Sequence, residues 1–196
     1  MAIGGTTALV TNPEGLDGKW VELRGHYISA TLLKKSLPQN FTLSYDIAAL
    51  QNFTWGAKGL TMQPGRETSP GNATSFISLK LRPGFNGSDG EAVVETKFTV
   101  PSGYLTGRKW YVAPGFSNNK KTNRITVTIK KLDENLQVFI DKTKIAEYEK
   151  AIPAAHLFNA LSFDCGGNTA ENDKYFISNI RITKDLAAYL KRFANF

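Results

Sequence analysis

The sequence predicts an all-β protein: an antiparallel β-sandwich of jelly-roll type that ends in a short C-terminal helix. Apolar and polar residues alternate with a period of two in most segments, which is the pattern of half-buried strands. Turn-forming residues separate these segments, and no segment has the spacing of a strand–helix–strand unit. Two sheets packed face to face in one domain satisfy these observations.

The N-terminal half contains five predicted strands. Two short strands cover residues 20–24 and 27–31. A third begins at Phe41, directly after the turn-forming residues 37–40, and its apolar residues alternate with Thr, Ser and Asp. Strands 75–82 and 93–100 follow, joined by a loop rich in Gly, Asn, Ser and Asp.

The C-terminal half continues the same pattern. Its predicted strands cover residues 109–112, 124–130, 136–140, 145–149, 158–164 and 174–183. Residues 124–140 form a clear antiparallel hairpin around the turn 133–135. A terminal helix is predicted after Asp185, because four apolar residues then form one stripe: Leu186, Tyr189, Leu190 and Phe193. The expected organisation is a loose segment over 1–15, the sandwich over 16–184 and a helix or linker over 185–196.

Composition supports a globular protein with a basic surface. The 196 residues are 41% hydrophobic, which is enough for a real core, and the formal net charge is +7. Most of the positive charge lies in the second half as Lys and Arg doublets, and longer basic tracts are absent from the sequence. We therefore expect a solvated basic surface and no specific nucleic-acid partner.

Residues 125–145 carry a resemblance to a known superfamily. The segment reads Ile-Thr-Val-Thr-Ile-Lys-Lys-Leu-Asp-Glu-Asn-Leu-Gln-Val-Phe-Ile-Asp-Lys-Thr-Lys-Ile. It resembles the hairpin of the concanavalin A-like lectin/glucanase superfamily, in particular its laminin-G-like and pentraxin-like members. Those members have glycine where Lys142 stands, so the turn after Asp141 is expected to differ. The resemblance covers residues 18–190 and implies the fold rather than a function.

Two further segments are similar to a domain that precedes the peptidoglycan-binding domain in some Bacteroidetes proteins of the outer-membrane protein A family. They are residues 173–182 and 37–46. This resemblance implies a bacterial envelope or secreted protein, located in the periplasm, at the outer membrane or outside the cell, with an envelope domain after the terminal helix. The sequence itself contains no signal-peptide pattern and no apolar run of about 18 residues, the length that would cross a bilayer.

The superfamily includes glycoside hydrolases, whose chemistry requires two carboxylates roughly 5–5.5 Å apart for retention or 6.5–9.5 Å apart for inversion. The sequence lacks a Glu-x-Asp-x-Glu run that would place such a pair along one strand. The nearest pairs are Glu91 with Glu95 and Glu147 with Glu149, and the second pair, beside Lys144, is typical of solvent ion pairs. We expect no enzymatic activity, and a hydrolase is the less favoured alternative.

No cofactor is predicted. Cys165 is the single cysteine, which excludes an internal disulfide and a multi-cysteine zinc site. Calcium is a possible ligand, because residues 86–91 and 164–173 carry oxygen-bearing side chains of the kind that bind calcium in lectins and laminin-G-like domains. The same residue types also form ordinary turns.

Carbohydrate binding without catalysis combines an exposed aromatic ring with polar side chains that bond sugar hydroxyls. The best cluster in this sequence surrounds Trp110, whereas Trp20 is expected in the core. Trp110 itself has two interpretations, a packing residue of the sandwich or a surface that stacks on a sugar. The candidate binding residues are Trp110, Tyr111, Tyr104, Arg108, Trp55 and Lys80.

Three functions follow from these observations. The first is a non-catalytic carbohydrate- or glycan-binding module. The second is a structural or protein-interaction domain of a cell-envelope protein without a sugar ligand. The third, and least favoured, is a glycoside hydrolase. Exposure of Trp110 beside a groove would favour the first function, and burial of all three tryptophans would favour the second.

Overall fold

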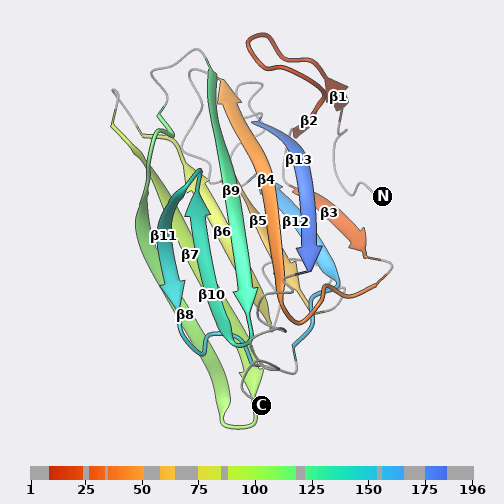
Figure 1. The fold of residues 1–196 in the computed structure, drawn as a ribbon, viewed down its shortest axis with the longest axis vertical. Helices are drawn as coiled ribbons and strands as arrows, with labels where there is room; N and C mark the ends of the chain where they lie inside the picture. The colour runs from red at the N-terminus through yellow and green to blue at the C-terminus, as the bar shows by residue number, and fades with distance from the viewer. Residues whose placement is uncertain are drawn as a thin grey trace, which may run out of the picture.

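The protein is a sandwich of two antiparallel sheets (Figure 1). The computed structural model describes residues 9–23, 27–33, 35–50, 58–64, 75–84, 88–117, 122–153, 156–165 and 175–184. The seven-stranded sheet has the spatial order β1 (Leu9–Thr11), β2 (Trp20–Leu23), β13 (Tyr175–Lys184), β4 (Phe41–Leu50), β9 (Thr122–Leu132), β10 (Asn135–Ile140) and β11 (Thr143–Tyr148). The six-stranded sheet has the order β3 (Tyr27–Leu32), β12 (Ala160–Cys165), β5 (Lys58–Gln63), β6 (Phe76–Arg82), β7 (Gly90–Val100) and β8 (Gly103–Ala113).

The two sheets enclose one main hydrophobic core. Alternate residues of each strand point inward, so Leu43 and Ile47 of β4 and Leu79 and Leu81 of β6 are fully buried. Aromatic rings connect the sheets, and the rings of Tyr45 and Phe163 meet edge to face with centroids 5.4 Å apart. The predicted all-β sandwich of jelly-roll type is confirmed, because the period-two pattern of the sequence is the pattern of burial in the structure.

Two strands lie where the sequence predicts none. β1 lies inside the N-terminal segment, and its residues pair with β2. β5 contributes only Leu60 and Met62 to the main core and contains Gly59, so its apolar pattern is too short to indicate a strand. β7 and β8 are each 11 residues long and extend beyond the predicted ranges as one long hairpin, visible in green in Figure 1.

A second, smaller apolar cluster contains Trp20, which is 1% exposed. It comprises Leu16, Trp20, Ala48 and Phe176, which form a cluster separate from the main core. The Trp20 indole N–H donates to the carbonyl of Asp17 at 3.0 Å. The prediction that Trp20 is buried is therefore confirmed, although it packs in the smaller cluster.

The hairpin turns use aspartate in the left-handed region of backbone space. Asp133 has a φ of 53° and Asp141 a φ of 51°, a conformation that Asp tolerates better than most residues. The Asp141 carboxylate also accepts a hydrogen bond from the Thr126 N–H at 2.9 Å. Asp141 therefore takes the left-handed conformation itself, and this explains why Lys142 is acceptable at the position where related hairpins have glycine.

A fully buried lysine joins the loop before β4 to the β9–β10 turn. The Lys131 ammonium donates to the carbonyls of Gln39 and Asp133, each at 2.7 Å. Burial lowers the pKa of Lys131, while the nearby carboxylates of Asp133 and Glu134 act in the opposite direction. The two carbonyls partly replace the water that this cation loses on folding.

The predicted C-terminal helix over 185–196 lies outside the described residues, as do residues 1–8. Within the described ranges, no helix has the length and apolar character that crossing a membrane would require.

Candidate functional site

The outer face of the six-stranded sheet carries a polar and aromatic cluster where β6, β7 and β8 lie side by side. Residues that alternate with the buried ones point away from the core along each strand. The antiparallel register places Lys80 opposite Val93 and Val93 opposite Trp110. It likewise places Glu95 opposite Arg108. Three strands that are distant in sequence therefore supply one continuous surface.

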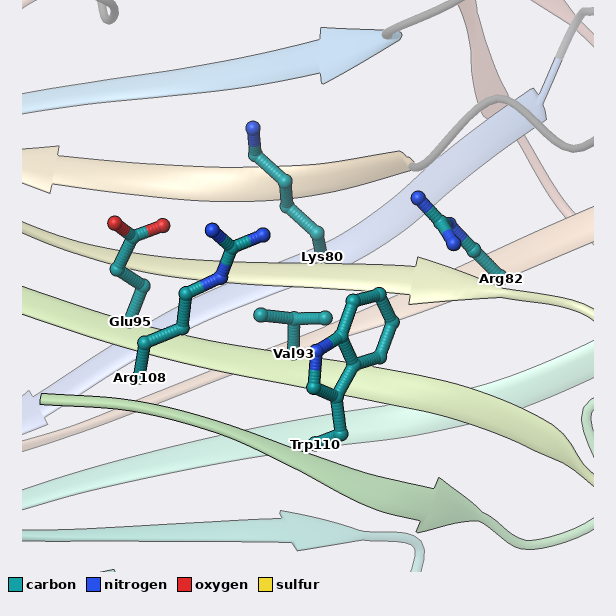
Figure 2. Close-up of a pocket in the computed structure, with 6 residues that line it drawn as sticks. All are labelled: Lys80, Arg82, Val93, Glu95, Arg108 and Trp110. Atoms are coloured by element: carbon teal, nitrogen blue, oxygen red, sulfur yellow. The ribbon is translucent and has the colours of Figure 1, made fainter.

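These side chains enclose a pocket of about 130 Å³. Its lining consists of Lys80, Arg82, Val93, Glu95, Arg108 and Trp110. Figure 2 shows Val93 between the two ends of the pocket, with Glu95 and Arg108 at one end and Trp110 and Arg82 at the other. Pockets that enclose drug-sized ligands measure about 300–1,000 Å³, so this pocket can hold one group of a ligand that extends beyond it.

Trp110 is a large aromatic residue that is exposed on this surface. Its exposed fraction is 44%, compared with 1% for Trp20. The guanidinium carbon of Arg82 lies 5.0 Å from the centroid of the indole ring, within the range of a cation–π contact. This contact orders the ring, while the exposed part of the indole stays available to a ligand.

The pocket also contains charged side chains with unused bonding capacity. Within the part of the chain that the structure describes, the side chains of Lys80, Arg108 and Glu95 form no hydrogen bond or ion pair. In Figure 2 the Arg108 guanidinium lies between Glu95 and Lys80. The pocket thus offers donors from Lys80 and Arg108, and an acceptor from Glu95, to a bound molecule.

Gly59 of β5 lies opposite Lys80 in the register. A Cβ atom at this position would lie 2.1 Å from the carbonyl oxygen of Leu79, a separation that real Cβ atoms do not reach. The residue directly opposite Lys80 on β5 therefore has no side chain.

The structure brings together three of the six predicted binding residues: Lys80, Arg108 and Trp110. Tyr111 does not share their pocket, because adjacent residues of a strand point to opposite faces. Its ring packs against Tyr148 of β11, with centroids 6.4 Å apart. The side chain of Tyr104, which lies in β8, and the whole of Trp55 are outside what the structure describes.

Three pocket residues were not among the sugar-binding residues predicted from the sequence: Arg82, Val93 and Glu95. The sequence does contain information about these residues. Alternation places Arg82 on the same face of strand 75–82 as Lys80, and it places Val93 and Glu95 together on one face of strand 93–100. Only the register between β6, β7 and β8 shows that they meet Trp110.

The two carboxylate pairs singled out in the sequence lie in different settings. Glu147 of β11 accepts a bond from the Lys144 ammonium at 2.5 Å and one from the Gln137 amide at 2.6 Å, which confirms the predicted solvent ion pair. Hydrogen bonds from Lys144 and Gln137 lower the pKa of Glu147. Glu91 and Glu95 share the outer face of β7, and Val93 stands between them in sequence.

A second pocket, of about 260 Å³, lies on the seven-stranded sheet around Asp46. Thr126 donates to one oxygen of this carboxylate at 2.7 Å. Arg124 and Asn179 donate to the other oxygen at 2.6 and 2.7 Å. Burial alone would raise the pKa of Asp46, but these three hydrogen bonds and the charge of Arg124 outweigh it, and the pKa lies below its usual value.

No group of three or more His, Cys, Asp or Glu side chains within the described ranges is arranged to hold a metal ion. Of the two segments predicted as possible calcium sites, residues 86–87 of the first and 166–173 of the second lie outside those ranges. Calcium binding therefore stays a prediction.

No protein-family model and no curated protein matches the sequence. Solved structures do match the fold. A glycoside hydrolase family 16 endo-glucanase from Bacteroides ovatus, in complex with G4G3G-2F-DNP, aligns with a TM-score of 0.61 and 14% identity over 89% of this chain and 85% of that one. LamAcat from Zobellia galactanivorans aligns with a TM-score of 0.51 and 12% identity, over 84% of this chain and 78% of that one.

A galectin also resembles the structure. Toad ovary galectin, in complex with thio-digalactose, aligns with a TM-score of 0.50 and 10% identity, over 81% of this chain and 99% of that one. At these identities the likeness bears on the fold alone. Together with the two-sheet topology, these neighbours show that the chain has the concanavalin A-like jelly-roll fold, an architecture shared by glycoside hydrolases and sugar-binding proteins.

Proposed function

We propose that the protein is a non-catalytic glycan-binding module that binds its ligand at the Trp110 pocket. One observation carries the proposal: a half-exposed tryptophan lies in a pocket beside Lys80, Arg108 and Glu95, whose side chains are unpaired among the described residues. A sugar ring presents C–H groups on its faces and hydroxyl groups on its edges. The indole surface can stack on the C–H groups of the sugar face. Lys80, Arg108 and Glu95 can form hydrogen bonds with the hydroxyl groups on its edges.

The proposed setting is a bacterial envelope or secreted protein in which another domain follows the sandwich. Support for this setting comes from the resemblance of residues 37–46 and 173–182 to envelope proteins. A binding module of this kind would hold its host protein on a polysaccharide.

The test is a glycan array with the wild-type protein, Trp110→Ala and Ile180→Ala. Ile180 is the matched control, because it is also 44% exposed but lies on β13 of the other sheet. We expect Trp110→Ala to weaken binding at least tenfold and Ile180→Ala to leave it unchanged, because only the first removes the stacking surface. Repeating the array with calcium and then with EDTA decides the calcium prediction.

Two results would contradict the proposal. If the wild type binds no glycan, the structural or protein-interaction domain becomes the better interpretation. If Ile180→Ala weakens binding at least tenfold and Trp110→Ala does not, the ligand lies on the seven-stranded sheet and the Trp110 pocket is the wrong site.

A hydrolase is the second candidate, kept because one carboxylate, that of Glu95, lines the Trp110 pocket. Incubating each bound glycan with the wild type and with Glu95→Gln tests it by the release of reducing ends. Release by the wild type that Glu95→Gln abolishes would make the pocket catalytic. We expect no release, in keeping with a binding module.

A further inference from the structure

The charges of the Trp110 pocket point to a narrower class of ligand. Three cationic side chains line the pocket, those of Lys80, Arg82 and Arg108, against the single carboxylate of Glu95. The positive groups come from two strands, β6 and β8, that flank β7. A cavity lined mainly by one sign of charge concentrates the potential there and attracts the opposite charge.

Two charged clusters elsewhere on the described surface provide a contrast. Asp46 is paired with Arg124, and Glu147 with Lys144. Lys80 and Arg108, by comparison, have no ion pair or side-chain hydrogen bond with any residue that the structure describes. Grouped cations without partners repel one another in the free protein, and an anionic ligand would relieve that repulsion.

The donor and acceptor balance leads to the same conclusion. Lys and Arg side chains only donate hydrogen bonds, whereas a sugar hydroxyl can both donate and accept. A pocket with two unpaired donor side chains and one acceptor side chain suits a group that mostly accepts. Carboxylate and sulfate oxygens are such groups, and Arg can bind them through two parallel hydrogen bonds.

We propose that the ligand is an acidic glycan, with one sugar against Trp110 and its carboxylate or sulfate ester between Lys80 and Arg108. This inference rests on the proposed glycan-binding function and names its substrate class. Arg82 has a different role, since its contact with the indole ring at 5.0 Å positions Trp110. The size of the pocket, about 130 Å³, suits one acidic group with the chain continuing outside.

The experiment measures affinity for polysaccharides that differ only in charge. One arm uses a polyuronate and the same polymer after reduction of its carboxyl groups to alcohols. A second arm uses a sulfated galactan and its desulfated form. A third arm uses double-stranded DNA, a polyanion without exposed sugar faces. The proteins are the wild type, Lys80→Met, Arg108→Met, Trp110→Ala and Lys142→Met, with thermal unfolding as a check on folding.

Lys142→Met is the matched charge control, because Lys142 is an exposed lysine in the turn between β10 and β11 of the other sheet. We expect the wild type to bind one acidic polymer at least tenfold more tightly than its neutralised form. Lys80→Met and Arg108→Met should each lose about tenfold in affinity for that polymer, whereas Lys142→Met should lose less than twofold. Trp110→Ala should weaken binding of both forms.

The other outcomes show whether the acidic-glycan inference alone is wrong or the proposed glycan-binding function is wrong as well. Equal binding of the acidic and neutralised polymers, still dependent on Trp110, overturns the acidic-glycan inference and leaves the proposed function intact. Binding of no polymer in either arm overturns both. Equal losses for Lys142→Met, Lys80→Met and Arg108→Met, or equal affinity for DNA, would show attraction to the overall charge of +7 and overturn the inference.

Discussion

The two outer faces of the sandwich carry charged clusters that differ in how their charges are satisfied. On the seven-stranded sheet, Asp46 is 4% exposed, and its carboxylate accepts hydrogen bonds from three side chains. On the six-stranded sheet, Lys80, Arg108 and Glu95 lie at the Trp110 pocket and form no side-chain hydrogen bond or ion pair within the described ranges. Both clusters border a pocket, but the central carboxylate of the first already has three bonding partners.

This difference separates a structural cluster from a binding one. A buried carboxylate is tolerated only where hydrogen bonds replace its lost water, so the partners of Asp46 are part of the folded state. Those partners come from β9 and β13, the two neighbours of β4 in the sheet. The charges at the Trp110 pocket are solvated, so removing one of them should alter ligand binding more than stability.

The largest expected effect is the loss of stability on replacing Asp46. Asp46→Ala removes a buried carboxylate that accepts hydrogen bonds from Thr126, Arg124 and Asn179, and should cost about 2–4 kcal/mol in the free energy of unfolding. Glu95→Ala is the matched control at the other pocket and should cost less than about 0.5 kcal/mol. Urea unfolding of both variants measures the two values. Equal losses would show that the clusters do not differ in role.

A smaller effect is expected at Asn179, which combines a hydrogen bond to Asp46 with a φ of 52°. Asn179→Gly removes the bond but suits the left-handed backbone, and should cost about 1 kcal/mol. Asn179→Ala adds backbone strain, for a total of about 2–3 kcal/mol. The difference between the variants in urea unfolding isolates the strain. Equal values would mean that the irregular pairing of β13 with β4 relaxes at little cost.

The smallest effect should appear on acidification. The pKa of Asp46 is lowered in the folded protein by hydrogen bonds and by Arg124, so its contribution to stability is present above the unfolded pKa of about 3.9. That contribution is lost as the pH falls through the lower pKa of the folded state.

Urea unfolding of the wild type and Asp46→Asn between pH 7 and pH 2 tests this effect. The difference in stability between the two proteins should shrink below about pH 4. A difference that stays constant to pH 2 would contradict the charged role of Asp46.

Much of the fold was predictable, and the candidate site was predictable in part. The alternation around Phe41 and the hairpin over 124–140 were clear, whereas β5, with only Leu60 and Met62 in the core, had too weak a pattern. Trp110 was identified as a candidate from its residue type and neighbours. Its partner Arg82 was not, because the two residues lie 28 positions apart in the chain and meet only through β7.

The sequence by itself determined the fold class and, for the strands that it predicts, the face on which each residue lies. A strand exposes alternate residues to opposite sides, so the period of two already separates Trp110 from Tyr111 and joins Lys80 with Arg82. Only the tertiary structure decided which strands are neighbours. The long-range register of β6, β7 and β8 places Lys80, Arg108 and Trp110 around one pocket, because pairing between strands depends on the packing of the whole core.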